Sequence, residues 1–443
     1  MNLSSRRMTE AKTVAFHTLG CKLNFSETSS ISRLMEKEGF EKKPFDGLAD
    51  IYVINTCSVT ENADKECRYL VRQIQRKSPE SFIVITGCYA QLKPKEIAEI
   101  PGVDLVLGAA EKFNMATHIR ELVKGDAAKI CSCDIEQVQD FHSGYSFNDR
   151  TRAFLKVQDG CDYSCSFCTI PLARGKSRSD SLQNVLENVR ELATKGIQEI
   201  VLTGVNLGDF RDADPGTNGT HFENGDPEYK RRTNDFFALA LSLDRVKEMP
   251  RFRISSIEPN LLNNDIIELV ANSDRFMPHF HVPLQSGSNK ILALMRRRYQ
   301  RELYADRVAR IKTLMPHAAI GADVIVGFPG ETDEDFEETR NFLHKLDLSY
   351  LHVFTYSERE NTRAIGMKPV VPMNIRHERN KILRNLSFQK LQWFTAQHAG
   401  QTRKVLFERS RDKAMMEGYT DNYIKVAVPF QQQWVNKIVE WRL

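Results

Sequence analysis

The first third of the chain alternates short apolar runs with amphipathic stretches. Apolar runs that predict strands occupy 14–16, 51–54, 82–85 and 105–107, and helical patterns cover 26–37 and 60–77. Strands that alternate with helical segments indicate parallel pairing. Residues 1–134 are therefore expected to form a doubly wound α/β domain, whose ligands gather beyond the carboxyl ends of the strands.

A second alternating series follows a polar linker at 135–150. Its predicted strands are 153–157, 198–203, 252–256, 279–283, 319–326 and 350–355. Six such βα units predict an incomplete barrel over 151–372, with its chemistry on the loops that follow the strands. The polar stretch 209–234, rich in Gly, Asn and Asp, predicts a surface insertion.

The end of the chain is basic and then strand-like. Residues 373–399 predict a basic connecting helix, and 400–443 predict a small β-barrel with the aromatic residues Tyr419, Tyr423 and Trp434 in an exposed pattern. The cations of 375–404 are Arg376, Arg379, Lys381, Arg384, Lys390, Arg403 and Lys404, against the single acid Glu378. Such a surface suits single-stranded nucleic acid, although a solvated helix beside an ordinary β core gives the same pattern.

Composition narrows the class of protein. The 443 residues carry a net charge of +4 and include nine cysteines. No apolar run approaches the roughly 20 residues that span a bilayer, and the start MNLSSRRMTEAK lacks the apolar core of a secretory signal. We therefore expect a cytoplasmic protein without a membrane partner, in which the cysteines bind metal rather than form disulfides.

Three cysteines lie within the eight residues CDYSCSFC: Cys161, Cys165 and Cys168. A [4Fe-4S] cluster that takes thiolates from such a loop keeps one iron open for a small-molecule ligand. A structural zinc site is the alternative, but it normally needs a fourth ligand, often from a second CxxC pair, and none stands nearby. The loop resembles the radical S-adenosylmethionine (SAM) signature. That resemblance implies SAM on the open iron and SAM contacts at Phe167, Gly204, Gln285, Ser286, Val326 and Gly327.

Three further cysteines follow predicted strands of the first domain. They are Cys21 in TLGCKLN, Cys57 in INTCSVT and Cys88 in ITGCYAQ. Parallel topology can bring these strand ends to one edge, so a second three-thiolate site is expected, with small buried core residues as the alternative. Cys67, inside a predicted helix, is expected to pack, and we assign no role to Cys131 or Cys133.

The whole chain from residue 13 onward resembles the methylthiotransferases. The resemblance rests on LGCKLNFSE, NTCSVT, TGCYAQ, CDYSCSFC, HVPLQSGS and GYTDNYIKV. It implies an N-terminal cluster domain, a radical SAM barrel and a C-terminal TRAM domain. GCKLN and GYTDNY are most similar to the branch that acts on N6-threonylcarbamoyladenosine in tRNA, beside the anticodon. The implied reaction places a methylthio group on C2 of the adenine, with two [4Fe-4S] clusters and with SAM as methyl donor and radical source. The implied partners are the tRNA anticodon stem-loop, an electron donor such as a flavodoxin or ferredoxin, and a sulfur source.

The carboxylate of that substrate calls for a cation. Arg296, Arg297 and Arg298 follow the fourth barrel strand and are the candidates. The alternative substrates are isopentenyladenosine tRNA and a ribosomal protein. Outside the methylthiotransferases, a non-enzymatic iron–sulfur carrier or an RNA-binding protein with a closed zinc site remains open.

Overall fold

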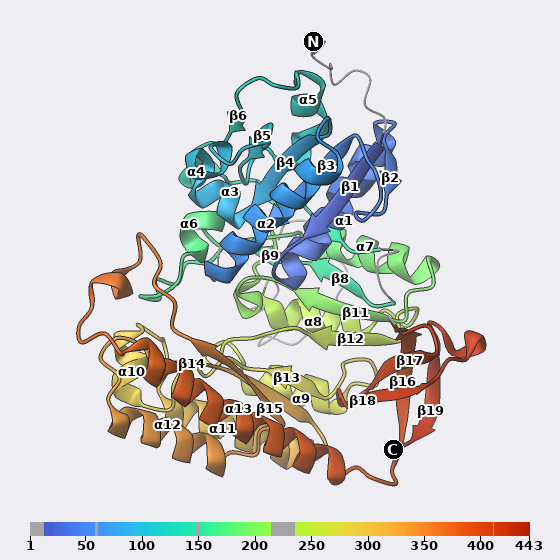
Figure 1. The fold of residues 1–443 in the computed structure, drawn as a ribbon. Helices are drawn as coiled ribbons and strands as arrows, with labels where there is room; N and C mark the ends of the chain where they lie inside the picture. Colours follow the sequence, from blue (N-terminus) through green and yellow to red (C-terminus); the bar gives the residue numbers. More distant parts are fainter. Residues whose placement is uncertain (1–12, 58–60, 148–150, 214–234, 411) are drawn as a thin grey trace. The chain divides into compact units, whose positions relative to one another are not determined.

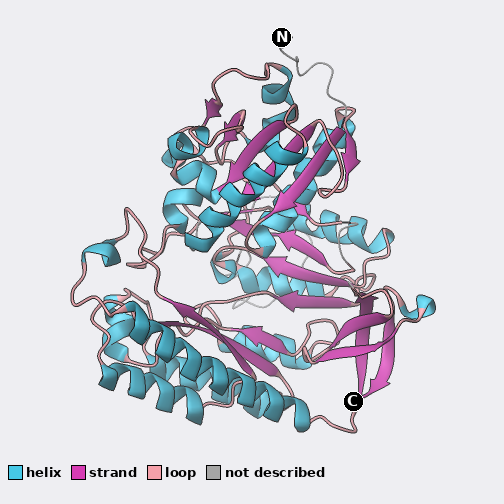
Figure 2. Cartoon of the chain, viewed as in Figure 1, coloured by secondary structure: helices cyan, strands magenta, loops and turns pink. Residues whose placement is uncertain are grey.

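The computed structural model describes residues 13–57, 61–147, 151–213, 235–410 and 412–443. The chain divides into two compact units, whose elements are drawn in Figures 1 and 2. The first unit is Met1–Asp149 with Phe154–Tyr163 and Cys168–Arg178, and the second is Arg150–Ala153 with Ser164–Phe167 and Ser179–Leu443. Most of the predicted insertion at 209–234 lies outside the described residues, as does the predicted polar start of the chain.

A parallel six-stranded sheet forms the centre of the first unit, in the order β2-β1-β3-β4-β5-β6. The strands are β1 (Thr13–Thr18), β2 (Glu41–Lys43), β3 (Ile51–Thr56), β4 (Phe82–Gly87), β5 (Leu105–Leu107) and β6 (Lys129–Cys131). β2 pairs with one edge of β1, and β3 pairs with the other edge. The strand order therefore reverses there, which gives a topological switch point between β1 and β3. The doubly wound α/β prediction is thereby confirmed.

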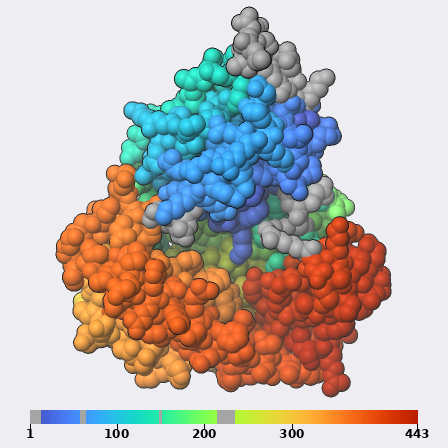
Figure 3. Space-filling view, in the orientation of Figure 1, coloured from blue at the N-terminus to red at the C-terminus, as the bar shows by residue number. Residues whose placement is uncertain are grey.

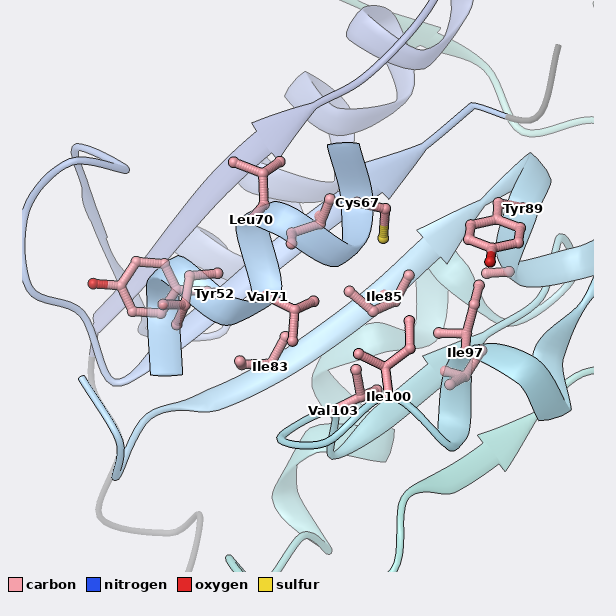
Figure 4. Packing of buried hydrophobic residues seen from close by; sticks show 14 of the residues in the cluster. Tyr52, Cys67, Leu70, Val71, Ile83, Ile85, Tyr89, Ile97, Ile100 and Val103 are labelled. Atoms are coloured by element: carbon pink, nitrogen blue, oxygen red, sulfur yellow. The ribbon is translucent and has the colours of Figure 1, made fainter. Parts of the chain in front are cut away.

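Both faces of the central strands of this sheet are buried, since every residue of β3 and β4 is buried, including the polar Asn55 and Thr56. Ile83 and Ile85 of β4 belong to one core, and Val84 between them belongs to the core on the opposite face. Figure 4 shows the first core, where Val71 lies beside Ile83 of β4. Cys67 is fully buried in the same core, which confirms its predicted packing role.

Helices flank the sheet and continue into the cysteine-bearing segments. They are α1 (Lys22–Lys37), α2 (Glu61–Lys77), α3 (Cys88–Leu92), α4 (Pro94–Ala98), α5 (Met115–Arg120) and the 3-10 turns η2 (Lys112–Asn114) and η3 (Ile135–Gln137). Helix α1 begins four residues before the predicted helix. Its first two turns bury polar side chains, among them Asn24 and Glu27, so apolar periodicity could not reveal that start.

The predicted linker contains structure of its own. Within it, β7 (Gly144–Tyr145) pairs antiparallel with β8 (Ala153–Lys156). β9 (Gln158–Asp159), the cysteine loop and helix α6 (Ile170–Arg174) follow. The first unit therefore includes residues that the sequence pattern grouped with the barrel.

The strands predicted for the barrel are present in the second unit after β8. β11 (Glu199–Thr203) pairs parallel with β12 (Arg251–Ile254), and β14 (Ala319–Val326) pairs parallel with β13 (His279–His281) and β15 (Tyr350–Thr355). The helices between them are α7 (Leu182–Thr194), α8 (Phe236–Asp244), α9 (Asn264–Asn272), α10 (Asn289–Leu294), α11 (Arg301–Leu314) and α12 (Asp333–Lys345). The short elements β10 (Arg178–Ser179), η4 (Leu207–Asp209) and η6 (Arg363–Gly366) complete this part.

Several of these helices begin at side chains suited to cap them. The side chains of Ser181, Asn263 and Thr332 each accept a hydrogen bond from the backbone N–H three residues on. Thr332 and Asp335 form a reciprocal capping box. Each such cap contributes about 1 kcal/mol, so the helix starts are set locally by sequence.

The C-terminal residues form helix α13 (Met373–Ala396) and a four-stranded antiparallel sheet in the order β18-β17-β16-β19. The sheet strands are β16 (Thr402–Arg409), β17 (Met415–Thr420), β18 (Lys425–Pro429) and β19 (Ile438–Arg442), with the turn η7 (Gln432–Trp434) before the last. In Figure 3 this sheet forms the red surface of the second unit. The sequence predicted Trp434 as exposed, but it is half-buried: its ring stacks on Phe407 and meets Trp441 edge-on against the core of the sheet.

Candidate active site

Three cysteines lie at the carboxyl ends of three neighbouring strands. Cys21 follows β1, Cys57 follows β3 directly, and Cys88 begins helix α3 at the end of β4. Because β1, β3 and β4 are adjacent in the sheet, the three loops share one edge of it. All nine cysteines are described, and none forms a disulfide.

Two glycines allow these loops to approach each other. Gly20 has a φ of +99°, and a Cβ there would lie 2.6 Å from the Cβ of Cys57. Gly87 has a φ of +98°, and a Cβ there would lie 2.3 Å from the carbonyl oxygen of Thr56. Any other residue at either position would be strained and would push the cysteine loops apart. Three thiols that follow adjacent strands at one sheet edge are the type of donor set that a three-thiolate iron–sulfur site uses.

Burial and neighbouring charges act on the Cys88 thiol. Burial raises the pKa of the Cys88 thiol, and the positive charge of Arg174 acts in the opposite direction. Arg174 lies at the end of α6, which packs against α3. Cys21 is exposed, and its Sγ lies 3.9 Å from Oδ1 of Asn24.

The second set of cysteines lies in the loop between β9 and α6. The backbone N–H of Tyr163 donates to Cys161 Sγ at 3.4 Å, and that of Ile170 donates to Cys168 Sγ at 3.5 Å. In the second unit, Nη1 of Arg297 donates to Cys165 Sγ at 3.2 Å. Hydrogen bonds of this kind stabilise thiolates, the form in which cysteine binds metal. Each of the three sulfurs thus accepts a hydrogen bond that would stabilise it as a thiolate.

The predicted SAM contacts either pack against neighbouring side chains or lie at the ends of strands. Phe167 meets Phe328 edge-on, with ring centroids 6.4 Å apart. Gly204 directly follows β11, and Val326 ends β14. Gln285 adopts a φ of 69° and pairs its backbone with β14.

Two further predicted SAM contacts are already engaged within the second unit. The hydroxyl of Ser286 lies 3.2 Å from that of Thr339. Gly327 has a φ of +74° and donates its N–H to Glu331 at 3.0 Å. A Cβ on Gly327 would lie 2.3 Å from the side chain of Arg376, so close packing requires glycine here.

The three consecutive arginines differ in environment. Arg297 is turned inward, with 4% of its side chain exposed, and pairs with Glu258. Arg296, at a φ of 59°, and Arg298 are exposed. The charge of Arg297 is therefore already engaged by protein groups.

A line of polar side chains that sequence analysis missed occupies β13, β14 and β15. Nε2 of His281 lies 2.9 Å from Oδ1 of Asp323, and Nδ1 of His352 lies 3.3 Å from the same oxygen. Burial alone would raise the pKa of Asp323, but the hydrogen bonds with His281 and His352 outweigh it and lower that pKa. Their ligand atoms all lie within 4.8 Å of one another, close enough to hold a metal ion. The histidines two residues apart in HFH, at positions 279 and 281, were the available sequence signal.

Next to this group, Gly321 makes room for an aromatic ring. A Cβ on Gly321 would lie 2.2 Å from Cζ of Tyr350. The hydroxyl of Tyr350 lies 2.8 Å from Nε2 of His279, whose ring stacks on Tyr423 of the C-terminal sheet at 4.1 Å. Tyr423, predicted as an exposed base-stacking residue, is thus in contact with protein rings.

The basic helix also differs from a simple cationic surface. Arg376 pairs with Glu358 at 2.6 Å, and Arg379 pairs with Glu331 at the same distance. Both arginines are buried, whereas Lys381 and Arg384 are exposed. Arg403, counted among the cations of 375–404 and placed in the predicted β-barrel, lies in β16 and pairs with Asp421. Only part of the predicted positive charge is therefore available to a partner.

A polar cavity of about 770 Å³ lies at the amino ends of β12, β13 and β14 in the second unit. Arg251, His317, Lys404 and Asp421 are among its lining residues. Barrel enzymes place their chemistry at the opposite, carboxyl ends of the strands. We therefore assign this cavity no catalytic role.

Among the described residues, no helix combines the length and the apolar character that crossing a membrane requires.

Comparison with known proteins relates two segments of the chain to protein families. Residues 13–108 match the uncharacterized protein family UPF0004, and residues 155–343 match the radical SAM superfamily. The chain is 39% identical over 442 residues to the threonylcarbamoyladenosine tRNA methylthiotransferase MtaB of Bacillus subtilis (strain 168), covering 97% of this chain and 93% of the relative.

A second relative has a different named product. The chain is 30% identical over 448 residues to the tRNA-2-methylthio-N(6)-dimethylallyladenosine synthase of Staphylococcus aureus (strain JH9), covering 99% of this chain and 84% of the relative. Among solved structures, the radical SAM methyltransferase TsrM from Kitasatospora setae superposes with a TM-score of 0.55 at 15% identity, covering 80% of this chain and 77% of that one. At that identity the likeness concerns the fold alone.

Proposed function

Because this chain belongs to the family of radical SAM tRNA methylthiotransferases, we propose that it inserts a methylthio group at C2 of N6-threonylcarbamoyladenosine beside the anticodon of tRNA. The observation that carries the proposal is the 39% identity to MtaB over 97% of the chain, against 30% to the dimethylallyladenosine enzyme. The difference favours the threonylcarbamoyl substrate over the isopentenyl one.

Six cysteines would hold the two [4Fe-4S] clusters of this reaction. Cys21, Cys57 and Cys88 suit one cluster, because they follow three adjacent parallel strands and glycines 20 and 87 let their loops approach. Cys161, Cys165 and Cys168 suit the other, because each of their sulfurs accepts a hydrogen bond. When bound, the clusters and SAM supply the sulfur transfer and radical chemistry that side chains cannot perform at an unactivated aromatic C–H bond.

SAM would contact residues at the strand ends of the barrel, mostly through their backbone. Gly204, Val326 and Gly327 offer backbone groups and little side chain, and Phe167 offers an apolar wall. Gln285 would present its side chain from a left-handed backbone position. Ser286 would contribute backbone atoms, because Thr339 engages its hydroxyl.

The tRNA would be bound by cations whose side chains reach the surface. Of the three consecutive arginines, we assign the substrate carboxylate to the exposed Arg296 and Arg298, because Arg297 is buried and paired with Glu258. The target adenosine must leave its stack in the anticodon loop to reach the clusters, as enzymes that act on bases require. An electron donor such as a flavodoxin or ferredoxin and a source of sulfur would complete the reaction in the cytoplasm.

The test is a competition assay with the anaerobically reconstituted enzyme, SAM and a chemical reductant. Three substrates are offered together: tRNA bearing threonylcarbamoyladenosine, tRNA bearing isopentenyladenosine, and ribosomal protein. Mass spectrometry of the digested products should show methylthiolation of the first. Preference for either of the others would overturn the substrate assignment, and absence of SAM cleavage would overturn the enzyme assignment itself.

A further inference from the structure

A buried group of charged side chains lies beside the N-terminal cysteines, within the first unit. It consists of Glu27 on α1, Lys112 on η2, Lys156 on β8, Asp159 on β9 and Arg174 on α6, each with at most 6% of its side chain exposed. We call it the buried charge cluster. Glu27 is its centre, with carboxylate contacts to Lys112 at 2.8 Å, Lys156 at 3.1 Å and Arg174 at 3.0 Å.

The buried charge cluster holds more positive than negative charge. Three cations face two carboxylates, and Arg178 adds a further cation 3.7 Å from Asp159. An uncompensated charge away from water is strongly unfavourable, because the protein interior does not replace its hydration. Burial lowers the pKa of Lys112, so a neighbouring anion is what would keep this ammonium group charged.

The cluster is connected to the cysteine loops through Asn24. Nη2 of Arg174 donates to Oδ1 of Asn24 at 2.6 Å. The amide nitrogen of Asn24 in turn donates to the carbonyl oxygens of Leu19 at 2.8 Å and Thr56 at 3.0 Å. Those two carbonyls belong to the loops that carry Cys21 and Cys57, and Oδ1 of Asn24 lies 3.9 Å from Cys21 Sγ. Arg174 also acts electrostatically on Cys88.

We propose that the buried charge cluster is the counter-charge of the N-terminal iron–sulfur cluster and raises its reduction potential. The inference rests on the proposed function, since it takes Cys21, Cys57 and Cys88 as the ligands. A four-iron cluster on three thiolates is an anion and gains one more negative charge on reduction, so nearby positive charge favours the reduced form. Asn24 and Arg174 act as positioning residues for the ligand loops, while Lys112 and Lys156 supply the surplus charge.

The test measures the potential of the N-terminal iron–sulfur cluster alone. The parent is the full chain with Cys161, Cys165 and Cys168 replaced by Ala, reconstituted anaerobically with iron and sulfide and titrated with EPR detection. Lys112→Gln should lower the ratio of reduced to oxidised cluster at least tenfold at a fixed potential, a shift of about 59 mV for one electron. Glu27→Gln increases the surplus positive charge and should shift the potential in the opposite direction.

The matched control is Lys124→Gln. Lys124 makes a largely buried pair with Asp104 at 2.8 Å, but it lies at the amino ends of β4 and β5, away from the cysteines. The Lys124→Gln substitution should leave the reduction potential of the N-terminal iron–sulfur cluster unchanged. Opposite shifts in the two test variants cannot come from reduced stability, which would act in the same direction in both.

A second measurement applies if the variants lose structure. Loading the iron–sulfur cluster should raise the melting temperature of the parent more than that of Lys112→Gln, because the surplus charge destabilises only the unloaded form. Equal gains, unmoved potentials or shifts in the same direction would overturn the inference and leave the proposed function intact. A parent that binds no iron would overturn both.

Discussion

Replacing Arg297 by Met tests whether this arginine supports the barrel cysteines rather than the substrate. The substitution keeps the length and apolar packing of the buried stem and removes the guanidinium. It thereby removes the hydrogen bond to Cys165 Sγ at 3.2 Å and the ion pair with Glu258. We expect the barrel site to bind iron more weakly.

The magnitude follows from the type of interaction. Removing a hydrogen-bonding partner of a metal ligand typically costs 10- to 100-fold in metal affinity. At about 1.4 kcal/mol per tenfold change, this equals roughly 1.4–2.7 kcal/mol. One hydrogen bond to a charged group contributes about 1.5–3 kcal/mol, so the single bond to Cys165 is sufficient to explain the weaker binding.

The assay is competition for iron with a chelator, in a chain whose Cys21, Cys57 and Cys88 are replaced by Ala so that iron reports on the barrel site. Arg296→Met is the matched control, because Arg296 is adjacent and exposed, and it should retain iron like the parent. The double variant Arg297→Met with Glu258→Gln removes the carboxylate that would otherwise be left unpaired, yet it still lacks the hydrogen bond to sulfur. If this double variant regains the parental iron affinity, the hydrogen bond between Arg297 and Cys165 has no role and the reasoning is refuted.

Three further predictions concern other parts of the chain. Arg379→Met should destabilise the second unit by about 3 kcal/mol, since it leaves Glu331 buried without its partner, whereas the exposed Arg384→Met should leave its thermal unfolding unchanged. In iron-free protein at pH 8, iodoacetamide should not label Cys67 unless the protein unfolds, because burial raises the pKa of this thiol to about 12 and keeps it protonated below that pH; mass spectrometry of the labelled peptides decides it. Replacing both Lys381 and Arg384 by Gln should lower the slope of log tRNA affinity against log salt by about 0.7–0.9 for each phosphate that is no longer neutralised, and an unchanged slope would exclude these residues from the tRNA surface.

Barrel strands such as β11 and β14 could be predicted because apolar residues dominate them and turn residues follow them. β12 and β13 have polar residues on both sides of a phenylalanine, and the apolar residues that follow them helped to mark their positions. Short β2 and β6 could not be predicted, since Glu41–Lys43 is polar and mostly exposed and Lys129–Cys131 alternates without an apolar run. They are strands because an existing sheet offers them backbone partners. Hydrophobic periodicity carries no information about such edge strands.

The cysteines of the candidate site could be predicted, because their spacing indicates their chemistry. The roles of its charged side chains could not, because they depend on which side chains are buried. Cysteines at strand ends carry their meaning in the sequence. The sequence does not show in which direction a charged side chain points. Arg376 and Arg379 therefore predicted a nucleic-acid surface, whereas in the structure they pair with Glu358 and Glu331. Glu27 was missed for the same reason, because a charged residue in the first turns of a helix usually faces water.

The close packing of Gly321 against Tyr350 limits which substitutions these two positions can accept. Alanine at 321 would place its methyl carbon 2.2 Å from the tyrosine ring, and both residues are held in paired strands that cannot separate locally. A related chain with a larger residue at the first position is therefore expected to carry a smaller one at the second. If the two substitutions occur one at a time, Tyr350 must be replaced by a smaller residue before Gly321 is replaced by a larger one. The geometry therefore fixes their order.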